Sequence, residues 1–294
     1  MKEKLVIRPA QLSDKEAVFK LCERTFDWGD YIPDVWEEWL KERHSIVLAA
    51  TLDDELLGIM RVALPKLSEA WFQAARTHPN HRREGVATAL AEACSEWARS
   101  MGARLARLST DSDNYVAQKA IEKLGFTRIS DFTIMKCEKL ELEEAENCRW
   151  AQKSELEGMW AFLQSSEILR ESAELYTVLF VWMSLARQDL EKFVVNEKAI
   201  VHYRDGTLDG LVLVDETVRE VWDGSPIQTC YIDGDLRTIL DMMGFLKAYA
   251  RQQRVTKVYA FACNTPTIVE ALAKAGFSRD DPNSEFIYQK ALVS

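Results

Sequence analysis

Hydrophobic positions in the first 140 residues follow two different spacings. Apolar residues three or four positions apart predict amphipathic helices, which we expect within residues 13–26, 27–42, 85–102 and 111–126. Short apolar and β-branched runs predict strands, which we expect at residues 5–8, 45–52, 55–64, 69–77 and 103–110, with two shorter pieces within 127–140. The resulting order, βα(α)βββαβαβ, predicts an α/β layer architecture, with a mixed, mostly antiparallel sheet flanked by helices.

Local signals place several boundaries of these elements. Ser13 followed by Glu16 predicts a capping box at the first helix. Asp53 and Asp54 separate two strand-like runs and predict a hairpin turn. Gly102 is suited to end the long third helix, because glycine readily adopts the left-handed conformation that follows many helices.

The pattern restarts in the second half of the chain. A charge-rich stretch near residue 141 resembles a linker, and residues 253–280 then repeat the strand, asparagine, helix and Gly-Phe order of residues 101–129. Such self-similarity predicts an internal duplication, although two unrelated α/β domains could imitate it. We therefore expect two domains, at residues 1–140 and 141–294, and a mostly buried helical region within 159–188.

Composition narrows the class of protein. The chain has no apolar run near the ~18 residues of a membrane helix and no signal-peptide core, so we expect a cytoplasmic protein without a membrane partner. A formal net charge of −10 argues against a nucleic-acid partner. Six scattered cysteines and four histidines show no zinc spacing, which predicts buried free thiols and no metal site.

One cationic stretch stands out in this acidic chain. The sequence HRREGVATAL, residues 81–90, lies between a predicted strand and a predicted helix. The first N–H groups of a helix have no partner within it, and the helix dipole adds positive charge there. Gly85 carries no Cβ, Ala87 is small and Arg82 supplies a cation. This combination favours a pyrophosphate site, with a solvated loop as the alternative.

Two motifs give the first half a resemblance to a known family. HPNHRREGVATAL resembles the acyl-CoA signature of the GNAT superfamily of N-acetyltransferases, R/Q-x-x-G-x-G/A, and NYVAQKAIEKLGF resembles its second signature. The resemblance spans roughly residues 5–140, whereas the Rossmann and Walker patterns are absent.

The resemblance implies a binding mode for acetyl-CoA. The backbone of Ala75, Arg76 and Thr77 would pair with the pantetheine arm, and Asn114 would bind near the pantetheine amide or cap its helix. The pyrophosphate would be wrapped by Arg82, Arg83, Glu84, Gly85, Val86, Ala87 and Thr88.

The proton-transfer residues are less well defined. Where the family often has a tyrosine that protonates the departing thiolate, this chain has Ile121, so water or Tyr115 would have to replace it. Glu69 begins the strand before the first motif and is the candidate general base, with a surface carboxylate as the alternative.

An aromatic and acidic segment, residues 26–40, is expected to border the acceptor cleft. Trp28, Asp30 and Tyr31 are the candidate substrate-binding residues, because aromatic faces and carboxylates together suit a cationic or aromatic amine. The alternative is that Trp36 and Trp39, with helical spacing, simply pack on the sheet.

The predicted function is acetyl transfer from acetyl-CoA to a primary amine of a small molecule or peptide, by a monomer or homodimer. The second half lacks the R-x-x-G-x-A pattern and has Asp233 and Asp235 in its place, so we expect a degenerate GNAT-like domain that does not bind CoA. Two alternatives stay open: an acyl-CoA-binding regulatory protein without activity, and a transferase of a larger acyl group.

Overall fold

The computed structural model describes residues 5–23, 29–141, 145–216 and 226–292. These residues form two compact units that alternate along the chain, and each unit is described by itself. The expected boundary between residues 140 and 141 stays a prediction. Unit 1 contains residues 1–109, 116–127 and 288–294, and unit 2 contains residues 110–115 and 128–287.

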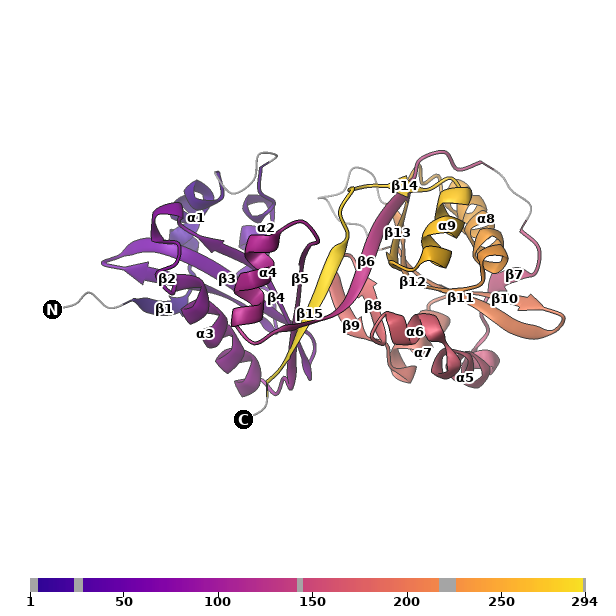
Figure 1. Cartoon of the computed structure of the whole chain (residues 1–294), viewed down its shortest axis with the longest axis horizontal. Coiled ribbons are helices and arrows are strands. Elements are labelled where there is room, and N and C mark those ends of the chain that lie inside the picture. The colour runs from indigo at the N-terminus through magenta and orange to yellow at the C-terminus, as the bar shows by residue number, and fades with distance from the viewer. Residues whose placement is uncertain (1–4, 24–28, 142–144, 217–225, 293–294) are drawn as a thin grey trace. The chain divides into compact units, whose positions relative to one another are not determined.

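Unit 1 has a sheet with strand order β1-β2-β3-β4-β5, in which only the β4–β5 pair is parallel (Figure 1). Apolar side chains of α1 and α2 pack with Ile59 on one face. Gly58, its neighbour in β3, faces the start of α3 on the other side. The elements are β1 (Val6–Pro9), α1 (Lys15–Cys22), α2 (Ile32–Trp39), β2 (Ser45–Leu52), β3 (Glu55–Lys66), β4 (Glu69–Thr77), α3 (Val86–Ser100), β5 (Leu105–Asp111) and α4 (Tyr115–Lys123).

Turn chemistry explains the boundaries of these elements. Asp53 and Asp54 have φ angles of 48° and 66°, and their left-handed backbone makes the tight turn between β2 and β3. Gly102 follows α3 with a φ of 98°, which confirms the predicted helix stop.

The predicted capping box at Ser13 is wrong. Asp14 has this role instead, because its carboxylate accepts a hydrogen bond of 2.7 Å from the backbone N–H of Gln11 and a pair of hydrogen bonds from Arg8. A short 3₁₀ turn, Leu12–Asp14, therefore precedes α1.

Strand β4 has an irregularity and an early end to one of its ladders. Ile59 lies opposite Arg76, whereas Arg61 lies opposite Gln73, so β4 contains one extra residue between them. Ala74, within this bulge, has a φ of 58°. On the other side, the parallel ladder with β5 has three rungs and reaches only Trp71. The remaining residues of β4 continue beyond that ladder toward α3.

Unit 2 repeats this topology with strand order β7-β10-β11-β12-β13, and β12–β13 is again its parallel pair. The elements are β6 (Thr127–Cys137), β7 (Cys148–Trp150), α5 (Leu156–Ser165), α6 (Glu167–Glu171), β8 (Leu175–Val178), β9 (Val181–Ser184), α7 (Arg187–Val195), β10 (Ala199–Arg204), β11 (Thr207–Asp215), β12 (Ile227–Gly234), α8 (Leu236–Gln252), β13 (Val258–Cys263), α9 (Pro266–Lys274) and β14 (Ser278–Arg279). The last strand, β15 (Glu285–Ala291), has residues 285–287 in unit 2 and its remaining residues in unit 1.

The predicted internal repeat is confirmed at the level of structure. In unit 2, strand β13 is followed by helix α9, and Gly276 after this helix has a φ of 86°. In the same way, β5 is followed by α4, and Gly125 after that helix has a φ of 85°. Two details differ from expectation. Strand β6 is continuous where two pieces were predicted, and the expected helical region contains the hairpin β8–β9 because β-branched and aromatic residues occur there.

The cysteines fit the expected class. All six are free thiols, and five are buried. Among the helices that the structure describes, none is both long and apolar enough to cross a membrane.

We expect Gly58→Ala to lower the stability of unit 1. A Cβ at this position would lie 2.6 Å from the carbonyl oxygen of Arg76 and 3.1 Å from Cγ1 of Val86, so β3 and α3 would have to separate. Overpacking of this kind costs about 1–3 kcal/mol, which thermal unfolding would measure. Gly158→Ala in α5 is the matched control, because its Cβ meets nothing within 4 Å. Equal melting temperatures for the two variants would contradict the prediction.

Candidate functional site

The connection between β4 and α3 turns sharply into the helix. A 3₁₀ turn, Pro79–His81, is followed by Arg83 with a φ of 69° and Gly85 with a φ of 87°. These two left-handed residues redirect the chain so that α3 begins at Val86, and the carbonyl of Gly85 accepts the hydrogen bond of Ala89 N–H at 2.9 Å. The first N–H groups of a 15-residue helix are thus presented at an exposed loop.

This loop has room and charge for an anion. A Cβ built on Gly85 would meet no atom within 4 Å, and Arg82 and Arg83 are both exposed. Glu84 is the one acidic side chain of the loop, and its carboxylate lies 2.9 Å from Nδ1 of His81. The helix dipole and the two arginines make this a favourable place for a phosphate group.

The splayed end of β4 leads to this loop. Ala75 is exposed, and Arg76 and Thr77 are half-buried at the same end of the strand. Val86 is buried under β3, whereas Ala87 and Thr88 lie on the more open side of α3. The structure thus brings the residues from Ala75 to Thr88 together along one continuous strand–loop–helix path.

The side chain of Arg76 is committed to a buried ion pair. Its Nε and Nη2 atoms donate to the two carboxylate oxygens of Asp30 at 2.7 and 3.1 Å. The Asp30 side chain is 2% exposed and also accepts a hydrogen bond from the N–H of Ile32. The carboxylate that was predicted to bind a substrate therefore fixes the entry to α2.

Glu69 also lies in a buried pair. Its carboxylate accepts a 2.6 Å hydrogen bond from Nη1 of Arg107 on β5, and Nε of Arg107 donates to Gln289 at 2.8 Å. Burial lowers the pKa of Arg107, and the charge of Glu69 opposes that shift. Glu69 is thus a buried residue at the start of the short β4–β5 ladder rather than a surface carboxylate. Its role as a base stays a prediction.

Asn114 and Tyr115 lie at the start of α4, and Tyr115 is not enclosed by the protein. Tyr115 is 68% exposed. The backbone N–H of Asn114 donates to the carbonyl of Asp111 at 3.1 Å. Both belong to unit 2, so their predicted roles with acetyl-CoA stay predictions. Ile121 is half-buried on α4.

The aromatic segment contributes mainly to packing. Trp36 and Trp39 are buried against the sheet, which confirms the packing interpretation for both residues. Tyr31 meets Trp39 edge to face, with ring centroids 5.8 Å apart. Trp28 lies outside the described residues. The binding roles predicted for Trp28, Asp30 and Tyr31 stay predictions.

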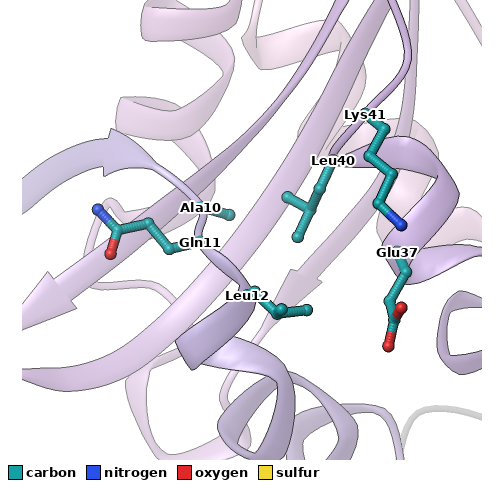
Figure 2. A pocket seen from close by; sticks show the side chains of 6 residues that line it. All are labelled: Ala10, Gln11, Leu12, Glu37, Leu40 and Lys41. Carbon is teal, nitrogen blue, oxygen red and sulfur yellow. The ribbon is translucent and has the colours of Figure 1, made fainter.

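A shallow cavity of about 400 Å³ lies at the C-terminal end of α2. Figure 2 shows its lining, with Glu37 on α2 and Leu40 and Lys41 directly after this helix. On the other side are Ala10, Gln11 and Leu12. No residue of the loop from Arg82 to Gly85 lines it, so this cavity and the anion site are separate features.

The corresponding helix start in unit 2 is closed by its own side chains. Asp235 caps α8 by accepting a 2.8 Å hydrogen bond from the N–H of Thr238. Arg204 donates to the same carboxyl, and this hydrogen bond lowers the pKa of Asp235. A carboxylate therefore occupies the position where an anion would approach the helix.

Comparison with known proteins agrees with this description. Residues 15–126, less than half of the chain, match the model of the acetyltransferase (GNAT) family, so this stretch is similar to a GNAT acetyltransferase domain. No curated protein matches the chain significantly.

Solved structures extend the similarity to both halves. A GCN5-related N-acetyltransferase from Sphaerobacter thermophilus has a TM-score of 0.63 at 13% identity, covering 99% of this chain and 96% of the other. A putative acetyltransferase from Thermoplasma acidophilum has a TM-score of 0.56 at 14% identity, covering 97% and 99%. A tandem GNAT protein from the clavulanic acid biosynthesis pathway has a TM-score of 0.55 at 12% identity, covering 99% of each chain. The whole chain therefore has the fold of two GNAT-like halves.

Three buried arginines of the sheet were not predicted as a group. Arg61, Arg76 and Arg107 each meet a carboxylate from another element, at Glu42, Asp30 and Glu69 respectively. The only available signal was an arginine within an otherwise apolar strand pattern, which implies a buried partner.

We expect Asp30→Ala to destabilise unit 1 strongly, since it leaves the guanidinium of Arg76 buried without its carboxylate. Loss of one partner of a buried pair typically costs about 3–5 kcal/mol, which denaturant unfolding would measure. Glu37→Ala removes the exposed partner of Lys15 and should leave the unfolding midpoint unchanged. An Asp30→Ala midpoint equal to that of the parent protein would show that the pair contributes nothing.

Proposed function

We propose that the chain is an N-acetyltransferase that transfers the acetyl group of acetyl-CoA to a primary amine of a small molecule or peptide. The observation that carries this proposal is the strand–loop–helix path, in which β4 leaves its ladder with β5 and leads to the exposed, glycine-containing start of α3.

Each part of acetyl-CoA has a matching feature along this path. The pyrophosphate would take the start of α3, between Arg82 and Thr88, where the first N–H groups of the helix follow two exposed arginines in the chain. The pantetheine arm would lie along Ala75, Arg76 and Thr77, beyond the last rung between β4 and β5. Its thioester would lie near the point where the two strands part.

The reaction needs one bond made and one broken. The neutral amine attacks the thioester carbonyl carbon, the new C–N bond forms, and the C–S bond breaks with its electron pair leaving on the thiolate. The amine loses one proton, and the thiolate gains one from water. A thiol pKa of about 8.5 makes the thiolate a fair leaving group, so Ile121 at the usual tyrosine position does not prevent transfer.

The requirement for a base depends on the amine. An α-amino group with a pKa of about 7.7–8.0 is already partly neutral at pH 7, whereas a lysine-type amine near 10.4 is almost entirely protonated. Glu69, buried beside Arg107, would act as base directly or through water. An α-amine fits this arrangement better, because it needs less help from a base.

Unit 2 is proposed to support unit 1 without binding CoA. Asp235 and Arg204 fill its helix start. This leaves a single proposed acetyl-CoA site in the chain.

One observation favours a different class, an acyl-CoA-binding protein without activity. Of the two residues considered as the acid, Tyr115 is exposed and Ile121 is apolar. Release of free thiol from acetyl-CoA in the presence of a panel of amines separates the two classes, and comparison of acyl-CoA lengths tests transfer of a larger acyl group.

Acetyl-CoA should raise the thermal stability of the protein, and Gly85→Glu should abolish that increase. A ligand at a hundred times its Kd adds about 2.7 kcal/mol, and a glutamate at the start of α3 would place a side chain and a negative charge where the pyrophosphate lies. Thermal-shift measurements with and without acetyl-CoA check both statements.

Gly102→Glu is the matched control for that experiment. Gly102 is also left-handed, with a φ of 98°, and a Cβ there also meets nothing within 4 Å, but it lies at the other end of α3. This variant should therefore suffer the same backbone strain and keep the shift. The absence of a shift in the parent protein would overturn the proposed site.

Glu69→Gln should lower kcat about tenfold to a hundredfold if Glu69 is the base, a reduction typical of general-base removal. Arg107→Gln disturbs the same buried pair but keeps the carboxylate, so it should retain more of the parent kcat. An undiminished rate for Glu69→Gln in a folded protein would remove Glu69 from the mechanism.

A further inference from the structure

Arg61 and Arg76 lie on the face of the unit 1 sheet that packs against α1 and α2. The two arginines differ in how many hydrogen bonds their Nε and Nη2 atoms donate. Arg76 donates from both Nε and Nη2 to the two oxygens of Asp30, so this edge is fully used. Arg61 donates from Nη2 to Glu42, whereas its Nε is buried and has no hydrogen-bond partner among the described residues. Of the two donors Nε and Nη2 of Arg61, only Nη2 therefore has an acceptor among the described residues.

An unpaired donor in this position is costly. The Arg61 side chain is 5% exposed, and its guanidinium carbon lies 4.7 Å from the centroid of the Trp39 ring. A buried donor without an acceptor destabilises the folded protein, and a carboxylate spanning Nε and Nη2 would remove that cost because both donors would then be paired.

The position of Arg61 connects it with the proposed reaction centre. Arg61 lies directly opposite Gln73 on β4, and Gln73 is two residues beyond the last rung with β5. Ile59, two residues before Arg61, packs with α1 and α2, so Arg61 is on the same face. Directly opposite residues are about 4.5–5.5 Å apart at their Cα atoms. The side chain of Arg61 therefore starts next to the point where β4 separates from β5.

We propose that Arg61 binds a carboxylate of the acceptor, and that the acceptor is an amine with a carboxylate close to its amino group, as in a free amino acid. This inference rests on the proposed acetyl transfer. With the carboxylate on Arg61, an amino group two bonds away would lie toward Gln73 and the parting strands. The acidic residue expected to select a cation, Asp30, is already neutralised by Arg76.

Glu42 occupies part of this site in the structure. Its side chain is 44% exposed, in the short connection after α2, and it contacts only one of the two donors. The acceptor carboxylate would displace it and pair with both Nε and Nη2. Glu42 therefore competes with the acceptor for the Arg61 guanidinium. Its contact also shows that a carboxylate can bind there.

The first test compares amino acids with their amides and decarboxylated amines as acceptors, by thiol release at saturating acetyl-CoA. The free acids should have kcat/KM values about tenfold to a hundredfold higher, the range expected for a charge-assisted bidentate pair. Titration calorimetry of the same compounds reads binding without turnover and should give the same order. Equal values for acids and amides, or a preference for amides, would overturn the inference.

Two variants test the residues. Arg61→Lys keeps the charge but not the fork, so the preference for acids should fall to within about threefold while amide turnover persists. Glu42→Gln removes the competing carboxylate and should lower KM for acids by about threefold or more. If Glu42 instead recruited a cationic acceptor, the same variant would raise KM. Glu55→Gln, an exposed glutamate at the β2–β3 turn, is the matched control and should change neither constant.

The outcomes separate this inference from the proposed function. If acetyl-CoA produces no thermal shift and no amine reacts, the acetyltransferase proposal fails. If amines react but neither the acid preference nor the response to Glu42→Gln is found, acetyl transfer stands and the carboxylate site fails. Because Arg61 is buried, the acetyl-CoA thermal shift of Arg61→Lys checks that the variant is folded, and Glu42→Gln carries the test if it is not.

Discussion

The short parallel ladder between β4 and β5 is the constraint on which unit 1 depends. With only three rungs, the ladder joins the strands at one end and releases β4 toward α3 at the other. The bulge at Ala74 adds a residue to β4 relative to β3, three positions beyond the last rung with β5, and so redirects the strand. A strand paired along its whole length would place its backbone groups in a ladder and could not offer them to a ligand. The short ladder therefore leaves an edge of β4 free of β5 and also leads β4 to the start of α3.

Buried ion pairs hold this open arrangement together. An opened sheet loses ladder hydrogen bonds, and here side chains from separate elements tie it at three positions. Arg76 fixes the entry to α2, Arg107 fixes the start of β4, and Arg61 meets the connection after α2. Such pairs stabilise little relative to apolar packing, but they are costly to break singly. These ion pairs are specific contacts that keep the sheet in one geometry. Among them, Arg61 has an unpaired Nε that could still bind a ligand.

The sequence predicted those parts of the molecule that depend on local chemistry. The order of elements, the Asp53–Asp54 turn, the end of α3 at Gly102 and the repeat that ends at Gly276 all follow from neighbouring residues. The ion pairs could not be predicted in this way, because their partners lie far apart in sequence and the pairing follows only from strand register. Asp30 illustrates the difference: its composition suggested cation recognition, whereas the register of β4 brings Arg76 to it.

A comparison of the two halves distinguishes what the fold requires from what the proposed activity requires. Gly58 lies opposite Thr77 in unit 1, and Gly210 lies opposite Gly234 in unit 2, so Arg76 and Asp233 occupy corresponding positions.

Each of these two residues ties its strand to the entry of a helix. Arg76 binds Asp30 before α2, and Asp233 accepts a 2.5 Å hydrogen bond from Ser166, the N-cap of α6. The charge has changed sign, yet the link between strand and helix is present in both units. Of the two corresponding helices, α3 begins without a side-chain cap, whereas Asp235 caps α8 in unit 2. The link therefore belongs to the architecture, and the open helix start is the feature that a ligand would require.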